Sequence, residues 1–277
     1  MSKKLGLLIL AVSFCFCTGC AVNPITGQKR LMLISEQQDF EVGRQYAPEV
    51  EKEMGGRIAN VSLQNYIDNV GQRIARVSHK PYWDYHFVAL NDKSINAFTL
   101  PGGYIFITKG MLKKLTTETQ LAGILAHEIV HVVARHYAAA ASRETSESGI
   151  MVLAAALSGA KVPAGAFGAA NVVRQIVGLR YSRKDEREAD LAGLDYMVVA
   201  GYNPYGTIES MQMLERENVV RPVEFFSTHP DPQNRIAYLE ARIQTRYGTF
   251  DGLRIGKEDY RRFVLEPLAK LKDSKKP

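Results

Sequence analysis

The chain has 277 residues, of which 46% are hydrophobic and 23% charged, and its formal net charge is +6 at pH 7. This composition can bury one substantial core, so it excludes a globally disordered chain. Two of the positive charges, Lys3 and Lys4, belong to an expected leader, which leaves the mature chain only mildly basic. Because basic and aromatic residues form no interleaved stripe, we expect no nucleic-acid binding.

Residues 1–19 are expected to be a signal peptide of the lipoprotein type. An apolar run over 5–16, too short to span a bilayer, is followed by Thr18-Gly19-Cys20. Small residues before a cysteine resemble the lipobox of bacterial lipoproteins, which implies acylation of Cys20 and a membrane anchor facing the periplasm. Cys17 stands where that motif has leucine, so an uncleaved anchor or plain secretion is the alternative. Ala21 favours the outer membrane under the enteric sorting rule.

The three cysteines all lie in this leader region, and none follows Cys20. The mature chain therefore has no internal disulfide and must be stabilised by its core. We expect one catalytic domain over residues 20–248, with a short C-terminal extension over 249–277.

The first part of that domain predicts two helices and a small sheet. Ser35 with Gln38 makes a capping box for a helix running towards Met54, and a second amphipathic helix runs from Ser62 to about Val77. Three short β-like runs follow, over 85–90, 95–100 and 104–108. Pro101-Gly102-Gly103 predicts a tight hairpin between the last two runs. A strand such as 104–108 could pair with an extended substrate backbone, or it could be an ordinary hairpin strand.

A helix carrying the sequence AHEIVHVVARH, residues 126–136, is the centre of the functional prediction. Thr117 and Gln120 form a capping box, and apolar residues recur at helical spacing through this stretch. His127 and His131 are four residues apart, so both imidazoles lie on one helix face and can converge on a zinc ion. Glu128 is placed to take a proton from an attacking water. The alternative is a surface histidine pair with a salt-bridging glutamate.

A third zinc ligand must come from elsewhere, and the stretch YSRKDEREADLAG, residues 181–193, offers carboxylates on a second expected helix. Glu186 and Asp190 are four apart and share a face. From spacing alone, Asp185 and Glu188 compete with Glu186 for the metal. Taken in isolation, the same stretch also fits a solvated, charged helix start.

The combination of HExxH with SRxxExxAD resembles the metallopeptidase family that includes HtpX, BepA and the CAAX prenyl endopeptidases, a gluzincin group. Two further segments carry the likeness, NAFTLPGGYIFITKGML (96–112) and STHPDPQNRI (227–236). It implies a zincin-like α+β fold, mainly helical, with a small sheet flanking the active-site cleft and one Zn²⁺ per chain. In this family Glu186 is the third ligand and Asp190 orients a zinc histidine. The lipobox points to the periplasmic lipoprotein branch.

The same resemblance singles out His229 and Arg235. His229 matches a histidine that approaches the zinc as a regulatory ligand or an oxyanion stabiliser, and Arg235 matches a nearby arginine. Without the resemblance, His229 would be read as a loop histidine. The other histidines, His79, His86 and His136, are expected to be structural or exposed.

The stretch 148–173 is rich in alanine and glycine, but Lys161 and Pro163 interrupt it, so we do not expect it to span a membrane. It predicts a helical lid over the cleft, or a surface that contacts lipid or an unfolded client protein, with a buried helical hairpin as the alternative. Asn203-Pro204 and Asp231-Pro232 each predict the start of a helix, and these helices end near Asn218 and before Gly248.

These features predict a membrane-anchored periplasmic zinc metalloendopeptidase that acts on misfolded or misassembled envelope proteins in quality control. The rival prediction is a chaperone-like outer-membrane assembly factor whose zinc site is latent, blocked by His229 or by the 148–173 stretch. A purely structural zinc site fits poorly, because such sites usually close with a fourth ligand and have no adjacent base.

Overall fold

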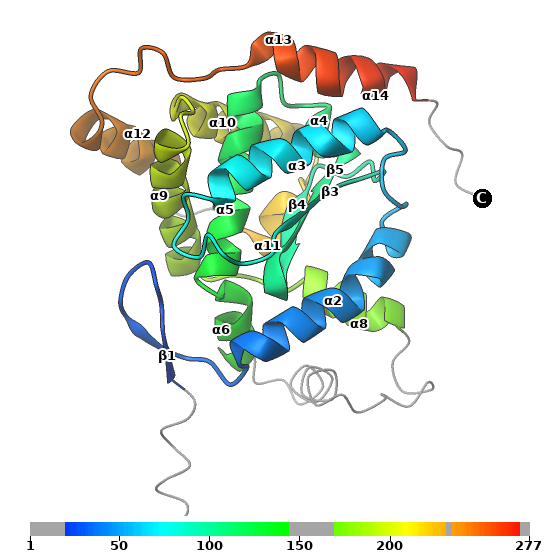
Figure 1. The fold of residues 1–277 in the computed structure, drawn as a ribbon, viewed down its shortest axis with the longest axis vertical. Coiled ribbons are helices and arrows are strands. Elements are labelled where there is room, and N and C mark those ends of the chain that lie inside the picture. The colour runs from blue at the N-terminus through cyan, green and yellow to red at the C-terminus, as the bar shows by residue number, and fades with distance from the viewer. Residues whose placement is uncertain (1–19, 144–168, 231–233, 272–277) are drawn as a thin grey trace, which may run out of the picture.

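The computed structural model describes residues 20–143, 169–230 and 234–271 (Figure 1). The predicted signal peptide, most of the 148–173 stretch and Asp231-Pro232 lie outside the described residues. Within them, no helix is both long enough and apolar enough to cross a bilayer.

The described residues begin with a short hairpin, in which β1 (Cys20–Val22) pairs antiparallel with β2 (Lys29–Leu31). Helix α2 (Glu36–Glu53) follows, and Ser35 and Gln38 form the predicted capping box. Helix α3 (Val61–Ala75) begins slightly earlier than predicted. Asn60 is its N-cap, because it is extended and its side chain accepts a hydrogen bond from the Leu63 amide at 2.9 Å.

The predicted small sheet is confirmed. It consists of β3 (His86–Leu90), β4 (Ala97–Leu100) and β5 (Tyr104–Thr108) in the order β3-β5-β4. Strand β4 is antiparallel to β5, and η1 (Pro101–Gly103) makes the tight connection, with Gly102 at φ 76° and Gly103 at φ 96°.

The proposal that 104–108 pairs with substrate is wrong, because β5 is the central strand. Strand β3 occupies one of its edges and β4 occupies the other, so none of its backbone is left for a peptide. Among the described residues no strand pairs with the outer edge of β4.

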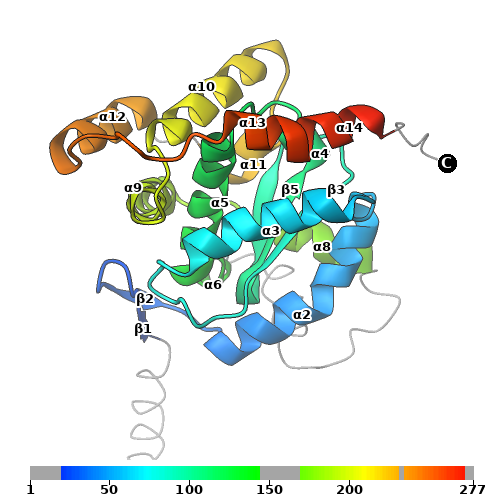
Figure 2. The ribbon, with the colours of Figure 1, turned by 45° about the horizontal axis from the view of Figure 1, so that its top comes forward.

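Helix α5 (Glu118–Val133) lies at the centre of the fold, and all its residues are buried. Thr117 caps it as predicted by accepting from the Gln120 amide, but the Gln120 side chain bonds to Thr116 instead of closing the capping box. In Figures 1 and 2, α5 runs between the sheet and α9 (Arg183–Val199), with α3 across it. A helix covered on all sides needs no amphipathic stripe.

The helix does not continue through His136 as the periodicity predicted. It ends at Val133, and after two intervening residues a separate helix, α6 (His136–Arg143), begins. Between them Arg135 adopts a left-handed φ of 54°. Its guanidinium holds this break in place, because Nε donates to Asp39 at 2.5 Å and Nη2 to the Ile34 carbonyl at 2.5 Å.

The second half of the chain is helical, as predicted. Asn203-Pro204 opens a helix as expected, although Pro204 is the cap and Asn203 accepts from the Tyr205 amide at 3.0 Å. Helix α12 (Arg235–Arg246) has Asn234 at its N-cap, in a left-handed conformation. The other described helices before α12 are α4 (Lys109–Leu112), α8 (Ala169–Val177), α10 (Tyr205–Val220) and α11 (Phe225–Thr228).

The described part of the C-terminal extension packs on the domain. It forms α13 (Lys257–Tyr260), η2 (Arg261–Leu265) and α14 (Glu266–Lys270), which lie beside α3 (Figure 2). Its buried side chains Tyr260, Val264 and Leu268 join the main hydrophobic core.

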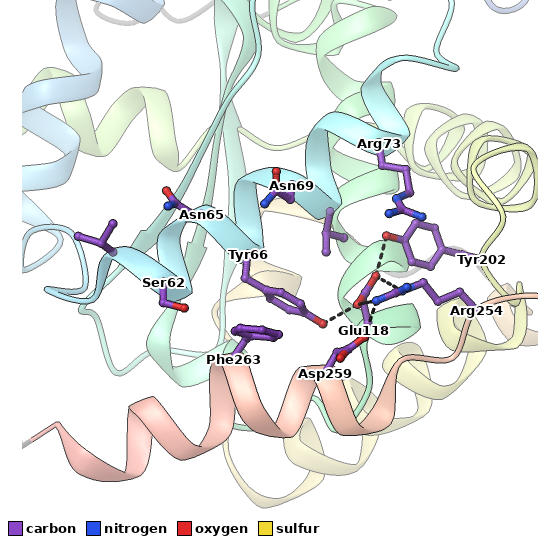
Figure 3. Close-up of a pocket in the computed structure, with 12 residues that line it drawn as sticks. Ser62, Asn65, Tyr66, Asn69, Arg73, Glu118, Tyr202, Arg254, Asp259 and Phe263 are labelled. Carbon is purple, nitrogen blue, oxygen red and sulfur yellow. Dashed lines mark hydrogen bonds and ion pairs between the residues drawn. The ribbon is translucent and has the colours of Figure 1, made fainter.

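An ion pair ties this segment to the start of α5. The buried Glu118 carboxylate accepts from Arg254 at 2.5 and 2.9 Å, from Tyr66 at 2.6 Å and from Tyr202 at 2.9 Å (Figure 3). The C-terminal segment thereby covers the end of the helix that carries the site.

Candidate metal centre and active site

His127 and His131 converge as their spacing predicted. They lie one turn apart on α5, and their Nε2 atoms are 3.0 Å from each other. Their side chains are 3% and 0% exposed. Both imidazoles therefore present one nitrogen to the same small, dry volume.

Glu186 completes this group from α9. Its Oε2 lies 3.4 Å from His127 Nε2, and its Oε1 lies 3.5 Å from His131 Nε2. Neither oxygen has a hydrogen-bond partner, although the side chain is fully buried. Asp185 and Glu188, the two competitors, face away from this group and pair with Arg30.

A glycine allows α9 to come this close to α5. A Cβ on Gly193 would lie 3.1 Å from the His127 amide nitrogen and 3.2 Å from the Ala126 carbonyl carbon. The absence of a side chain there lets Glu186, two helical turns earlier, reach the histidines.

His229 joins the group from the end of α11. Its ligand nitrogen, the ligand nitrogens of His127 and His131, and a carboxylate oxygen of Glu186 all lie within 4.8 Å of one another. Its Nδ1 lies 3.2 Å from the Phe225 carbonyl, to which it can donate, so Nε2 is free to face the site. The Phe225 ring stacks on the imidazole at 4.3 Å and holds its orientation.

Glu128 lies beside this group and is fully buried. Its Oε1 is 3.4 Å from His229 Nε2, and neither carboxylate oxygen has a hydrogen-bond partner. Burial, with a smaller contribution from the nearby Glu186, raises the pKa of Glu128 to about 8.

Asp190 and Arg235 lie beside His127. Asp190 Oδ1 lies 3.0 Å from His127 Nδ1, Arg235 donates to the same oxygen at 2.5 Å, and the Tyr238 hydroxyl donates to Oδ2. Burial would raise the pKa of Asp190, but Arg235, His127 and Tyr238 outweigh it and lower the pKa to about 2. Asp190 is therefore ionised and orients the imidazole through its Nδ1–H.

The electrostatics of the group favour a bound cation. Burial opposes a charge on His127, yet its hydrogen bond to Asp190 and the nearby carboxylate of Glu186 raise its pKa to about 9. Burial and the charge on His127 keep the pKa of His131 well below its ordinary value. Two carboxylates with unpartnered oxygens beside imidazole nitrogens fit the ligand chemistry of zinc.

His136 is a functional candidate that sequence reasoning missed. It was expected to be structural or exposed, but it is fully buried and its Nδ1 lies 2.9 Å from His131 Nδ1. No local signal could have revealed this, since it depends on the helix break at Arg135. His79 and His86 are partly or largely exposed, as expected, with His79 bonded to Tyr196.

A mainly helical α+β fold, in which an HExxH helix and a glutamate from a second helix meet beside a small sheet, defines a zincin-like metallopeptidase. The comparisons with known proteins agree with this class. The chain belongs to peptidase family M48, and the sequence model of that family matches residues 62–243.

Three relatives illustrate the likeness. The chain is 31% identical over 192 residues to a Vibrio cholerae protein provisionally named as a beta-barrel assembly-enhancing protease, covering 66% of this chain and 39% of that one. It is 26% identical over 242 residues to the beta-barrel assembly-enhancing protease of Escherichia coli, with coverages of 84% and 49%. It is 31% identical over 240 residues to the mitochondrial metalloendopeptidase OMA1 of Schizosaccharomyces pombe, with coverages of 85% and 70%. The chain thus spans half or less of the two bacterial proteins.

Proposed function

We propose that this chain is a zinc metalloendopeptidase in which His127, His131 and Glu186 hold the metal and Glu128 is the general base. The observation that carries the proposal is the buried group itself. Unpartnered carboxylate oxygens lie beside two imidazole nitrogens in a volume sealed from water. Burying such oxygens is costly unless a cation compensates them.

Glu128 performs the proton transfers. Bound zinc supplies Lewis-acid chemistry, polarising a carbonyl and lowering the pKa of a water. Glu128 lies next to the metal group with both oxygens free, so it can take a proton from the attacking water and return it to the leaving amine. Its raised pKa, about 8, lies close to neutral pH, where a group can serve as base and then as acid.

The edge strand β4 is the candidate place for a substrate backbone, although its four residues are buried and α8 packs against it. It lies beside α5, and no described strand pairs with its outer edge. An extended peptide can add to such an edge through main-chain hydrogen bonds, which demand little of its sequence. That suits a protease that acts on many unfolded chains.

His229 is proposed as a regulatory ligand that closes the site, in preference to an oxyanion stabiliser. Its nitrogen belongs to the four-ligand group, whereas a catalytic zinc keeps one position open for water or substrate. His229 must therefore move away before a peptide can reach the metal. The closed arrangement is also what an assembly factor with a latent zinc site would show, so both functions need to be tested.

The cellular setting is inferred from the leader and the relatives. The lipobox-like Thr18-Gly19-Cys20 supports a lipid anchor facing the periplasm, and Ala21 supports the outer membrane. The names of the bacterial relatives refer to assembly of β-barrel proteins. We propose that the substrates are misfolded or misassembled envelope proteins.

The test is zinc content together with cleavage of an unfolded model protein, using the form that begins after Cys20. One zinc per chain, with cleavage lost in Glu128→Gln while zinc is retained, would establish the peptidase. One zinc per chain with no cleavage, even when His229 is replaced by alanine, would favour the assembly factor. Absence of zinc would overturn the proposal.

A further inference from the structure

On the side away from the metal group, the imidazole of His131 contacts a second imidazole, that of His136. Its Nε2 faces the metal group, while its Nδ1 lies 2.9 Å from Nδ1 of the fully buried His136. A histidine that binds a metal through Nε2 carries its proton on Nδ1. His131 must therefore donate and His136 must accept, which places the proton of His136 on its Nε2.

Two carboxylates face that proton. His136 Nε2 lies 3.4 Å from Glu188 Oε1 and 3.8 Å from Asp185 Oδ1, and both acids belong to the first turns of α9. An N–H aimed at carboxylates is favoured over a lone pair aimed at them. The pair of acids thereby selects the tautomer of His136 that can accept from His131.

The N-terminal hairpin holds these carboxylates. Arg30 in β2 donates to Asp185 at 2.9 Å and to Glu188 at 2.5 Å. Asn23, just after β1, donates to Glu188 at 2.5 Å. Arg30 is only 11% exposed in its side chain, so this double ion pair is shielded from water.

The break between α5 and α6 makes the contact with His131 possible. On a continuous helix, residues five apart lie about 140° from each other and cannot touch. The left-handed Arg135 turns the chain so that His136 faces back towards His131. A non-glycine residue in this conformation is strained, and Asp39 and the Ile34 carbonyl hold it there.

We propose that His136 is a positioning residue for the zinc ligand His131, and that the β1–β2 hairpin fixes it through Arg30. This rests on zinc ligation by His131, proposed above. It makes the segment that directly follows Cys20 part of the support of the metal centre. The two zinc histidines are then oriented by different groups: His127 by the carboxylate of Asp190, and His131 by the imidazole of His136.

The test measures zinc affinity of the full chain in detergent by competition with a chelator. His136→Leu, which keeps an apolar side chain but no acceptor, is expected to weaken zinc binding by about 10- to 100-fold. His136→Asn, whose side-chain oxygen can accept from His131, should recover much of the affinity. Arg30→Met is expected to weaken zinc binding severalfold. Arg57→Met, which removes an exposed bidentate ion pair with Glu51, should leave the zinc affinity unchanged.

Urea unfolding of the metal-free variants separates positioning from a general structural role. Positioning lowers zinc affinity while the metal-free midpoints stay close to wild type. Lowered midpoints with unchanged zinc affinity in His136→Leu and Arg30→Met would overturn the inference. If His136→Leu does not fold, wild-type zinc affinity in Arg30→Met would overturn it as well. Absence of zinc from the wild-type chain would instead refute the proposed function.

Discussion

His229 Nε2 lies 3.4 Å from Glu128 Oε1, and both side chains are fully buried. The candidate general base therefore faces a histidine that also belongs to the metal group. One imidazole can close the metal and cover the base at the same time. His229 lies at the end of the four-residue helix α11, so a small movement of this helix would free both.

Replacing His229 by alanine is expected to increase cleavage of an unfolded protein severalfold, because it opens the position that the imidazole closes. Zinc should be retained, since His127, His131 and Glu186 remain. Initial rates measured with fluorescently labelled casein, alongside zinc content, test this. His79→Ala, which removes a histidine remote from the metal group, is the control and should leave the rate unchanged. A loss of cleavage in His229→Ala would mean that His229 assists the reaction.

Glu186→Gln is expected to abolish stoichiometric zinc binding and yet to stabilise the metal-free protein. Burial raises the pKa of Glu186, and both its oxygens lack partners, so its charge costs stability when no cation is present. The gain should be about 1–3 kcal/mol in the free energy of unfolding. Urea unfolding with and without chelator measures both effects, with the exposed Glu53→Gln as control. Zinc bound at wild-type affinity in Glu186→Gln would rule this residue out as a ligand.

Asp190 is expected to make metal-free stability fall in acid. Its pKa in the folded chain is about 2, below the ordinary 3.8, so the folded state favours the ionised form. The contribution, about 2 kcal/mol, is fully present above about pH 4 and is lost as the pH falls towards 2. Tyr238→Phe removes one donor to this carboxylate, so it should raise the pKa of Asp190 and shift the loss to higher pH.

Unfolding free energies between pH 2 and 6 provide the measurement. Other carboxylates titrate in the same range, so the informative quantity is the difference between wild type and Tyr238→Phe at each pH. That difference should be largest above pH 4 and vanish near pH 2. A difference that stays constant across the range would show that Tyr238 does not act through the ionisation of Asp190.

Gly193→Ala is expected to destabilise the protein by about 1–3 kcal/mol and to weaken zinc binding. The added Cβ would lie 3.1 Å from the His127 amide nitrogen, so α9 must move away from α5 and carry Glu186 with it. Thermal unfolding and chelator competition measure the two effects. Gly248→Ala, at a position with nothing within 4 Å, is the matched control. Unchanged zinc affinity in Gly193→Ala would contradict the role given to this close approach.

Tyr260→Ala is expected to destabilise the domain by about 3–5 kcal/mol, a cost typical of removing a large buried aromatic ring. Tyr260 is fully buried, although it lies beyond the predicted domain boundary at residue 248. Tyr260→Phe keeps the ring and loses only the hydrogen bond to the Leu112 carbonyl, so it should cost about 1 kcal/mol. Equal, small effects of both changes would support a loosely attached extension.

The sequence alone determined the parts of the site that are built within one element. His127 and His131 meet because a helix places residues four apart on one face, and the capping residues Ser35 and Gln38 of α2 act over three positions. The strands and the tight hairpin were predicted for the same reason: turn chemistry and alternation are local. The resemblance to known metallopeptidases added Glu186 and Asp190.

Only the tertiary structure decided which carboxylate meets the histidines. Asp185 and Glu188 share one side of α9 and both pair with Arg30, whereas Glu186 points to His127 and His131, and the packing of α9 on α5 selects it. It also decided the role of His136, because the break that turns this residue back depends on Asp39, far away in the sequence. Spacing along one helix is set by local backbone geometry, whereas the direction in which a helix faces is set by the surfaces that cover it.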